Sequence, residues 1–357
     1  MMAAWNLKRT PLILSSIMTS MWFKSLTGFT EESPEQVRSN LELDGQTITS
    51  RINGRRMACG QLETPTLGEL RQMALDGTTD NGRLTVREVV ADTKQLHQES
   101  ENAGSMFQVA SQFNLLEMIS PSISPEKGVG IYENDMTQGP ACAVAAGAGT
   151  IYRNYFASVG DQIGQTSDNQ IDCLRDMGEQ LGNNEGRLWT MNNGYAQASA
   201  EGLADISSQI MAMEEPERDT LRDQLRIGIQ WDTEVTLGDC GHLVTQAYCS
   251  ALPVSYSHHS EELWEAFSRI VLEASYEATL AAALINFNRA EKKTVYLTLL
   301  GGGAFRNNIN WILDAISRGI DRYSDYPLDV VIVSYGQSNP LVQELCRSKL
   351  VSDTNFL

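Results

Sequence analysis

The sequence predicts an α/β fold in which helices are layered on a β-sheet, and three observations support that prediction. Short apolar runs, such as residues 294–300 and 328–334, are typical of buried strands. A longer run, residues 260–287, opens on a capping serine and has the length of a helix. In the second half of the chain the two kinds of segment alternate, as they do in layered α/β domains.

Composition and charge narrow the class of partner. The chain has 357 residues, a net charge of −18 and a pI of about 4.6. These values argue against an extended basic face for nucleic acid or for a membrane surface. A small anionic ligand stays compatible with them, because backbone N–H groups can bind phosphate without a net positive surface. The six cysteines include no CxxC pair and there are only four histidines, so we expect no metal site and reduced thiols.

Residues 1–83 are predicted to form an N-terminal, mainly helical or irregular extension, followed by one domain at residues 84–357. Ser33 before Pro34 is typical of a helix start, and Thr66 with Glu69 has the spacing of a capping box. The apolar residues 11–23 resemble a weak signal peptide but are diluted by serine and threonine, with no small-x-small cleavage site. They are also too few for a membrane span. We therefore expect a cytoplasmic protein.

A glycine triplet in "TLLGGGAFRNN" separates a predicted strand from a predicted helix. A Walker phosphate loop is excluded because no Lys-Ser or Lys-Thr pair follows the glycines. A dinucleotide fingerprint is disfavoured because the third glycine is missing. Two interpretations stay open: a tight strand-to-helix turn, or an anion cradle in which Gly301, Gly302 and Gly303 adopt positive φ and the next helix adds its N-terminal dipole.

Other polar residues follow a second strand, in "VASQFNLLEM", and precede a small-residue helix, in "GVGIYENDMTQGPACA". Ligands of open α/β sheets bind at the carboxyl ends of strands, where such loops meet. We therefore expect these residues to face the ligand together with the glycine loop: Gln112, Asn114, Glu117, Gly130, Glu133, Asp135 and Gln138.

The order of these motifs resembles the macrodomain superfamily of ADP-ribose-binding modules and hydrolases. The similar segments are "VREVVADTKQL", "FQVASQFN", "GVGIYENDMTQGPACAVAAGAG", "TLLGGGAFRNNINWILDAI" and "LDVVIVSY". The resemblance spans about residues 84–350, with an enlarged middle. It implies a three-layer α/β/α domain with a mixed sheet that binds ADP-ribose and needs no cofactor.

The segments "WTMNNGY", "IQWDTEVT" and "YCSALPVSYS" look more like a divergent branch that includes bacterial-effector and eukaryotic ADP-ribosyl hydrolases acting on ADP-ribosylated ubiquitin. This likeness implies an ADP-ribosyl hydrolase that removes mono-ADP-ribose from a protein side chain, with arginine-linked ubiquitin as one candidate. The segment "GVGIYENDMTQG", which resembles the first glycine loop of the superfamily, has no adjacent Glu-Glu pair, and this disfavours cleavage of the polymer. Two alternatives stay open: a reader that binds ADP-ribosyl marks without cutting them, and a hydrolase of a small ADP-ribose derivative.

The resemblance also assigns ligand contacts. Asp92 would accept a hydrogen bond from the adenine amino group, and Phe113 or Phe305 would stack on a ring unless it belongs to the core. The glycine loop would hold the phosphates through Gly301, Gly302, Gly303, Ala304, Phe305, Arg306 and Asn307.

Cleavage of the glycosidic bond needs a carboxylate that stabilises an oxocarbenium-like state or activates water. The sequence "WDTEVTLGDCGH" gathers Asp232, Glu234 and Asp239 around a turn, and we expect Asp232 to act first and Asp239 second. Asp135, with Glu133, forms a second acidic cluster, unless it only caps the helix that follows. Cys142 and Cys249 are weaker candidates for a nucleophile, because neither has an adjacent histidine in sequence.

Overall fold

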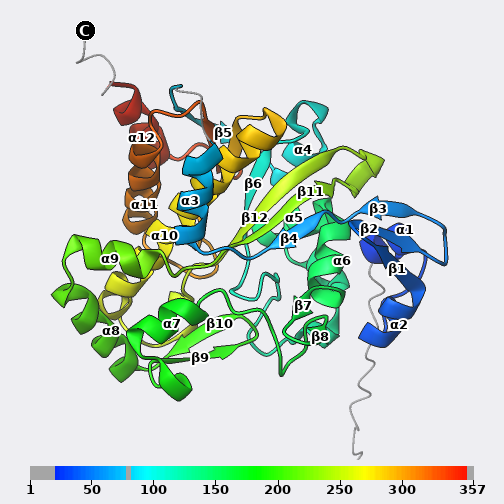
Figure 1. Cartoon of the computed structure of the whole chain (residues 1–357), viewed down its shortest axis with the longest axis horizontal. Coiled ribbons are helices and arrows are strands. Elements are labelled where there is room, and N and C mark those ends of the chain that lie inside the picture. The colour runs from blue at the N-terminus through cyan, green and yellow to red at the C-terminus, as the bar shows by residue number, and fades with distance from the viewer. Residues whose placement is uncertain (1–20, 78–81, 352–357) are drawn as a thin grey trace, which may run out of the picture.

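The computed structural model describes residues 21–77 and 82–351, so the apolar segment predicted at residues 11–23 lies mostly outside it. A seven-stranded mixed sheet lies between two layers of helices (Figure 1). This architecture confirms the predicted α/β class with three layers and a mixed sheet.

Strand direction decides which ends of the sheet can form a site. The order across the sheet is β4 (Gln61–Glu63), β11 (Gly228–Glu234), β12 (Leu243–Cys249), β6 (Met106–Ala110), β13 (Thr294–Leu297), β14 (Asp329–Ser334) and β5 (Thr85–Val90). The last five of these run parallel, so their carboxyl ends meet at one edge of the sheet. Strand β11 runs antiparallel to both of its neighbours, and its C-terminal end therefore lies at the opposite edge.

The sequences of the strands follow from their places in the sheet. Strand β6, "MFQVA", and strand β14, "DVVIVS", are buried along almost their whole length, as expected where helices cover both faces of a parallel sheet. Strand β5 forms one border of the sheet and is more exposed, with Val86 as its one buried residue. Its Arg87 and Glu88 place charge on this edge, which discourages pairing with another chain.

Helices α3 (Leu67–Gly77), α10 (Glu261–Ala290) and α11 (Ile309–Arg322) pack together in one layer, and α4 (Thr93–Gln98), α5 (Gln138–Ala145) and α6 (Gly147–Tyr155) form the other (Figure 1). Among the described residues, α10 alone is long and apolar enough to cross a membrane by length and composition. Its most apolar window is 83% buried inside the structure, as in a core helix. The small-residue helix predicted before residue 156 is two helices, because the backbone breaks at Ala146.

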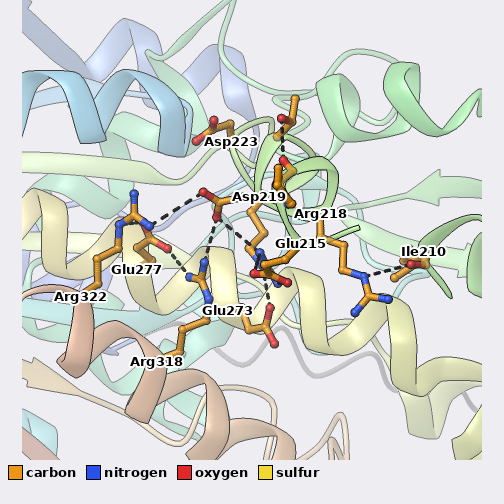
Figure 2. Close-up of polar contacts among 12 residues, drawn as sticks. Ile210, Glu215, Arg218, Asp219, Asp223, Glu273, Glu277, Arg318 and Arg322 are labelled. Atoms are coloured by element: carbon orange, nitrogen blue, oxygen red, sulfur yellow. Dashed lines mark hydrogen bonds and ion pairs between the residues drawn. The ribbon is translucent and has the colours of Figure 1, made fainter. Parts of the chain in front are cut away.

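A network of ion pairs joins α3, α10, α11 and α9 (Glu215–Arg222) (Figure 2). At its centre the side chain of Glu277 is fully buried. Arg71 Nε lies 2.6 Å and Arg322 Nε 2.8 Å from Glu277 Oε1, and Arg318 contacts the other oxygen. Asp219 of α9 pairs with Arg71 and Arg318 as well. Carboxylates from two helices therefore share arginines from two others, which fixes how the four helices cross.

The N-terminal region differs from the predicted helical extension. It contains α1 (Met21–Thr27), α2 (Pro34–Asn40) and a small sheet of β1 (Leu41–Asp44), β2 (Thr47–Ser50) and β3 (Arg56–Ala58). Strand β4 then joins the main sheet and α3 packs on α10, so the chain has no structural boundary at residue 83. The predicted helix starts are confirmed, since Ser33 Oγ accepts the Gln36 N–H and Thr66 and Glu69 form a reciprocal capping box.

The enlarged middle of the chain, after α6, lies outside the seven-stranded sheet. Its elements are β7 (Ser158–Val159), β8 (Gln162–Ile163), α7 (Arg175–Leu181), β9 (Trp189–Asn192), β10 (Tyr195–Ala198), α8 (Ala200–Ala212) and α9, and the described chain ends with α12 (Pro340–Val351). Hairpin β9–β10 brings Tyr195 to the edge of the sheet where the parallel strands end.

Candidate functional site

A cleft of about 900 Å³ opens at the edge where the five parallel strands end. Its walls are the loops that follow β5, β6, β12, β13 and β14, together with the loop that precedes α5. This position follows from the topology, because ligands of open α/β sheets bind beyond the carboxyl ends of the strands. The volume is near the upper end of the range for small-molecule sites.

The glycine loop after β13 offers a row of free backbone donors. The N–H groups of Gly303, Ala304 and Phe305 line the cleft, and the described part of the chain provides no acceptor for them. A Cβ added at Gly303 would meet no atom within 4 Å, so this backbone is open to a ligand. Consecutive free N–H groups are suited to bind a phosphate.

Internal hydrogen bonds fold the rest of this loop. Gly302 N–H donates to Leu299 O at 3.0 Å, and Asn307 N–H donates to Gly301 O at 2.9 Å. Gly301 has a φ of 74°, and a Cβ there would collide with Ala251. Of the three glycines only this one has positive φ, which corrects the expectation that the whole triplet would adopt it. The tight turn and the free amides therefore occur in one loop, and the two interpretations of the triplet do not exclude each other.

Three aromatic rings pack against one another in the wall of the cleft. The ring centroids of Tyr195 and Tyr256 lie 5.3 Å apart, and each lies 5.5 Å from the ring of Phe305. Tyr195 is fixed because its hydroxyl donates to Met118 O at 2.6 Å. Phe305 was among the predicted ligand contacts, but Tyr195 and Tyr256 were not. The sequence signal that could have indicated them is that both tyrosines lie in segments that look like the divergent branch, "WTMNNGY" and "YCSALPVSYS".

Three carboxylates line the cleft, and two of them keep an oxygen free. Asp92 Oδ1 accepts the Lys94 N–H and Asp135 Oδ1 accepts the Thr137 N–H, both at 2.8 Å. The second oxygen of each side chain has no hydrogen-bond donor among residues 21–77 and 82–351. Asp135 therefore closes a local turn before α5 and does not cap that helix, whose N-cap residue is Thr137, and it still offers one oxygen to a ligand.

The third carboxylate, Glu117, is buried beneath the cleft in an ion pair with Arg153. Arg153 Nη2 lies 3.0 Å from one oxygen of Glu117 and 3.2 Å from the other, and neither side chain is exposed. Burial, opposed only in part by Arg153, raises the pKa of Glu117 to about 7. Arg153 also donates to Leu115 O and to the hydroxyl of Tyr248, over whose ring it stacks.

This buried pair holds the turn that forms the floor of the cleft. Leu115 has a φ of 65°, which is costly for a branched residue, and Arg153 Nε binds its carbonyl at 2.8 Å. Gln112 begins the turn, and its Oε1 accepts the Met118 N–H at 2.8 Å. The amide nitrogen of Gln112, which lines the cleft, has no partner in the described chain and can donate to a ligand.

Gln138 lines the cleft, but its amide is already used. Oε1 accepts the Ala110 N–H at 2.9 Å and Nε2 donates to Gln108 O at 2.8 Å, so the side chain continues the ladder of β6. A Cβ at the next residue, Gly139, would collide with Ala110 O. Glycine here therefore lets the first turn of α5 approach the end of β6, and Gln138 is a clamp between the two elements.

Three predicted ligand contacts lie away from the cleft. Phe113 belongs to the main hydrophobic core, which settles the choice between core and stacking in favour of the core. Asn114 is fully buried, and its side chain bonds Gln170 and the Leu116 N–H within the floor turn. Arg306 is exposed at a positive φ of 54° and does not line the cleft.

Gly130 and Glu133 bind the N-terminal segment of the chain instead of a ligand. Glu133 accepts the N–H groups of Met21 and Trp22, and Glu31 accepts those of Val129 and Gly130. These reciprocal contacts join residues about 100 positions apart, which no local sequence pattern indicates. They anchor the loop that continues to Asp135 in the cleft.

The acidic trio predicted to be catalytic lies at the wrong edge of the sheet, because β11 runs antiparallel. Each carboxylate has a structural partner there. Asp232 lies 3.3 Å from Arg289, Glu234 accepts the Ala58 N–H at 2.9 Å, and Asp239 pairs with Arg55 at 2.7 Å. None of the three lines the cleft.

Neither candidate thiol has the character of a nucleophile. Cys142 and Cys249 are buried, and burial raises the pKa of each to about 12. Within the described ranges, no group of three or more His, Cys, Asp or Glu side chains converges in a way that could hold a metal ion.

No protein-family model matches the sequence, and no curated protein matches it either. Solved structures with a distantly similar fold include two bacterial poly(ADP-ribose) glycohydrolases. The enzyme from Thermomonospora curvata is 11% identical with a TM-score of 0.43, and the match covers 89% of this chain and 95% of that one. The enzyme from Deinococcus radiodurans, in complex with ADP-ribose, is 11% identical with a TM-score of 0.41, covering 82% and 94%.

Proposed function

We propose that this protein is an ADP-ribosyl hydrolase that removes mono-ADP-ribose from a modified protein side chain. The observation that supports it best is the row of free N–H groups at Gly303, Ala304 and Phe305 in the same cleft as the free oxygens of Asp92 and Asp135. A dinucleotide-like ligand with a diphosphate in the middle needs this combination: amides for the phosphates and carboxylates for groups on either side of them.

In this proposal the diphosphate binds the glycine loop, where free amides stabilise negative charge. The free oxygen of Asp92 accepts a hydrogen bond from the adenine amino group. The unpaired amide N–H of Gln112 donates a hydrogen bond to the ribose next to the scissile bond. Phe305, with Tyr195 and Tyr256, provides an apolar wall for that sugar.

Asp135 is the proposed catalytic residue, because it is accessible and keeps one oxygen free. Its carboxylate takes a proton from water as the water oxygen attacks the anomeric carbon, and the bond from that carbon to the side-chain nitrogen breaks. The leaving nitrogen takes a proton, and the products are ADP-ribose and the unmodified side chain. Glu117 is excluded from this role because its side chain is buried and paired with Arg153.

A reader that binds ADP-ribose without cutting it is the second candidate. The observation that favours it is the position of Asp232, Glu234 and Asp239 at the opposite edge of the sheet. Without this acidic trio, Asp135 is left as a single accessible carboxylate near the proposed scissile bond. A hydrolase of a small ADP-ribose derivative would use the same cleft.

Two measurements on the same preparation separate these functions. Calorimetry with ADP-ribose tests binding, and release of ADP-ribose from mono-ADP-ribosylated proteins, with arginine-linked ubiquitin first, tests cleavage. Binding with release supports the hydrolase, and binding without release from any linkage supports the reader. Turnover of small ADP-ribosides alone supports the third function, and absence of binding rejects all three.

A further inference from the structure

Exposed apolar side chains gather around the mouth of the cleft. Five of the large hydrophobic residues that the described structure leaves exposed line it: Ile119, Met136, Tyr256, Tyr335 and Leu341. They come from five separate segments, namely the loops after β6 and before α5, the turn after β12, the loop after β14 and the first turn of α12. A single exposed apolar residue is ordinary, but several around one opening mark an interaction site.

Ile119 and Met136 are the aliphatic members that lie next in sequence to the floor turn and to the proposed catalytic residue, Asp135. Met136 follows Asp135 directly and is 77% exposed, and Ile119 is 49% exposed at the end of the floor turn. Neither side chain can hydrogen-bond a nucleotide. A ligand held on the glycine loop gains no polar contact from them, whereas a second apolar surface laid over the mouth would bury them.

The charge of the mouth indicates what kind of surface would cover them. The accessible charged side chains that line the cleft are Asp92, Asp135 and Lys94, and the whole chain has a net charge of −18. This balance favours a partner that carries positive charge. A modified side chain lies over the mouth by necessity when its ADP-ribosyl group occupies the cleft.

We propose that Ile119 and Met136 form a docking surface for the carrier protein. The surface that they contact is an apolar patch beside a cationic modified side chain such as arginine. This inference rests on the proposed function and adds to it that the carrier is recognised through its folded surface and not through the ADP-ribosyl group alone.

The test compares two double variants. Ile119→Ser with Met136→Ser removes the proposed docking surface. Ile163→Ser with Met211→Ser is the matched control, because those side chains are 53% and 75% exposed and lie outside the cleft. For each protein, kcat/KM is measured on arginine-ADP-ribosylated ubiquitin and on ADP-ribosylarginine, and ADP-ribose affinity is measured by calorimetry.

We expect the Ile119/Met136 variant to lose about tenfold or more in kcat/KM on the modified protein, which corresponds to about 1.4 kcal/mol or more of lost interface contact. Its rate on ADP-ribosylarginine and its affinity for ADP-ribose should match those of the parent and of the control. Equal losses on both substrates would assign the two residues to the small-ligand site and overturn the inference. Unchanged rates on both would overturn it as well. If the parent protein, without any substitution, neither binds ADP-ribose nor releases it from the substrates, the proposed function itself fails.

Discussion

Arg153 and Glu117 form an ion pair that is buried on all sides directly beneath the cleft, with Nη2 of Arg153 3.0 Å from Oε1 of Glu117. Buried ion pairs seldom stabilise a protein more than apolar residues of similar size would, because desolvation offsets their attraction. The other contacts of Arg153 suggest a positional role, since it also binds the carbonyl of Leu115 in the strained floor turn.

The raised pKa of Glu117 predicts a pH dependence of stability. Because its pKa is about 7 in the folded state and near 4.5 when unfolded, the folded protein binds the extra proton between these values. Protonation of Glu117 therefore contributes fully to the free energy of unfolding below about pH 4.5. This contribution, up to ~3 kcal/mol, is lost as the pH rises to about 7. Glu117→Gln imitates the protonated form, so urea unfolding at pH 5 and pH 8 should show a smaller decline for this variant than for the parent. Equal declines would contradict the assignment.

Asp135→Asn should slow the chemical step. We expect ADP-ribose release to slow by roughly two to four powers of ten, the size of one positioned acid–base group, with little change in affinity for ADP-ribose. Asp232→Asn is the matched control, because it removes a carboxylate at the opposite edge of the sheet. Normal release by Asp135→Asn together with slow release by Asp232→Asn would reinstate the acidic trio as the catalytic centre.

Glu31→Ala should loosen the loop that carries Asp135. The Glu31 carboxylate accepts the N–H groups of Val129 and Gly130 and the hydroxyl of Tyr155, and its loss leaves these donors unpaired at a cost of about 1–3 kcal/mol each. Amide hydrogen exchange at Val129 and Gly130 should become faster, and ADP-ribose release should fall. Glu32→Ala, which alters an exposed neighbour, serves as the control. Unchanged exchange at both amides would show that the N-terminal segment does not hold the loop.

The ion network of Figure 2 predicts a large effect for one buried carboxylate. Glu277→Gln removes the charge that Arg71, Arg318 and Arg322 share, and we expect the free energy of unfolding to fall by about 3–5 kcal/mol. Glu262→Gln, at the exposed start of the same helix, should change it by less than about 0.5 kcal/mol. Denaturant unfolding measures both, and similar stabilities of the two variants would refute the structural role of the network.

The sequence predicted the part of the fold that local patterns determine. Apolar runs located β6, β13 and β14, and the glycine triplet located the loop with the free amides. The direction of β11 could not be predicted from its own residues, because it depends on how the strand pairs with β4 and β12, which come from distant parts of the chain. The error over Asp232 follows directly from this, since strand direction decides at which edge a strand-end residue lies.

Long-range contacts explain the other differences. Gly130 and Glu133 have the residue types of a ligand loop, but their partners are about 100 residues away at the N-terminus. Arg153 reads as part of an ordinary helix, although it is the residue that holds the floor turn. Tyr195 and Tyr256 lie about 60 positions apart and become neighbours only through the packing of the enlarged middle against the glycine loop.

The central claim is that the cleft binds ADP-ribose through the backbone of the glycine loop. Gly303→Val tests it most directly, because a Cβ at Gly303 would meet no atom within 4 Å, so the valine should cover the free amides without disturbing the fold. Gly302 is a poorer probe, since a Cβ there would lie 3.2 Å from Ile312 Cδ1. Calorimetry with ADP-ribose should show binding by the parent and a loss of about tenfold or more in Gly303→Val at an unchanged melting temperature. Equal affinity of the two proteins, or no binding by the parent, would contradict the account.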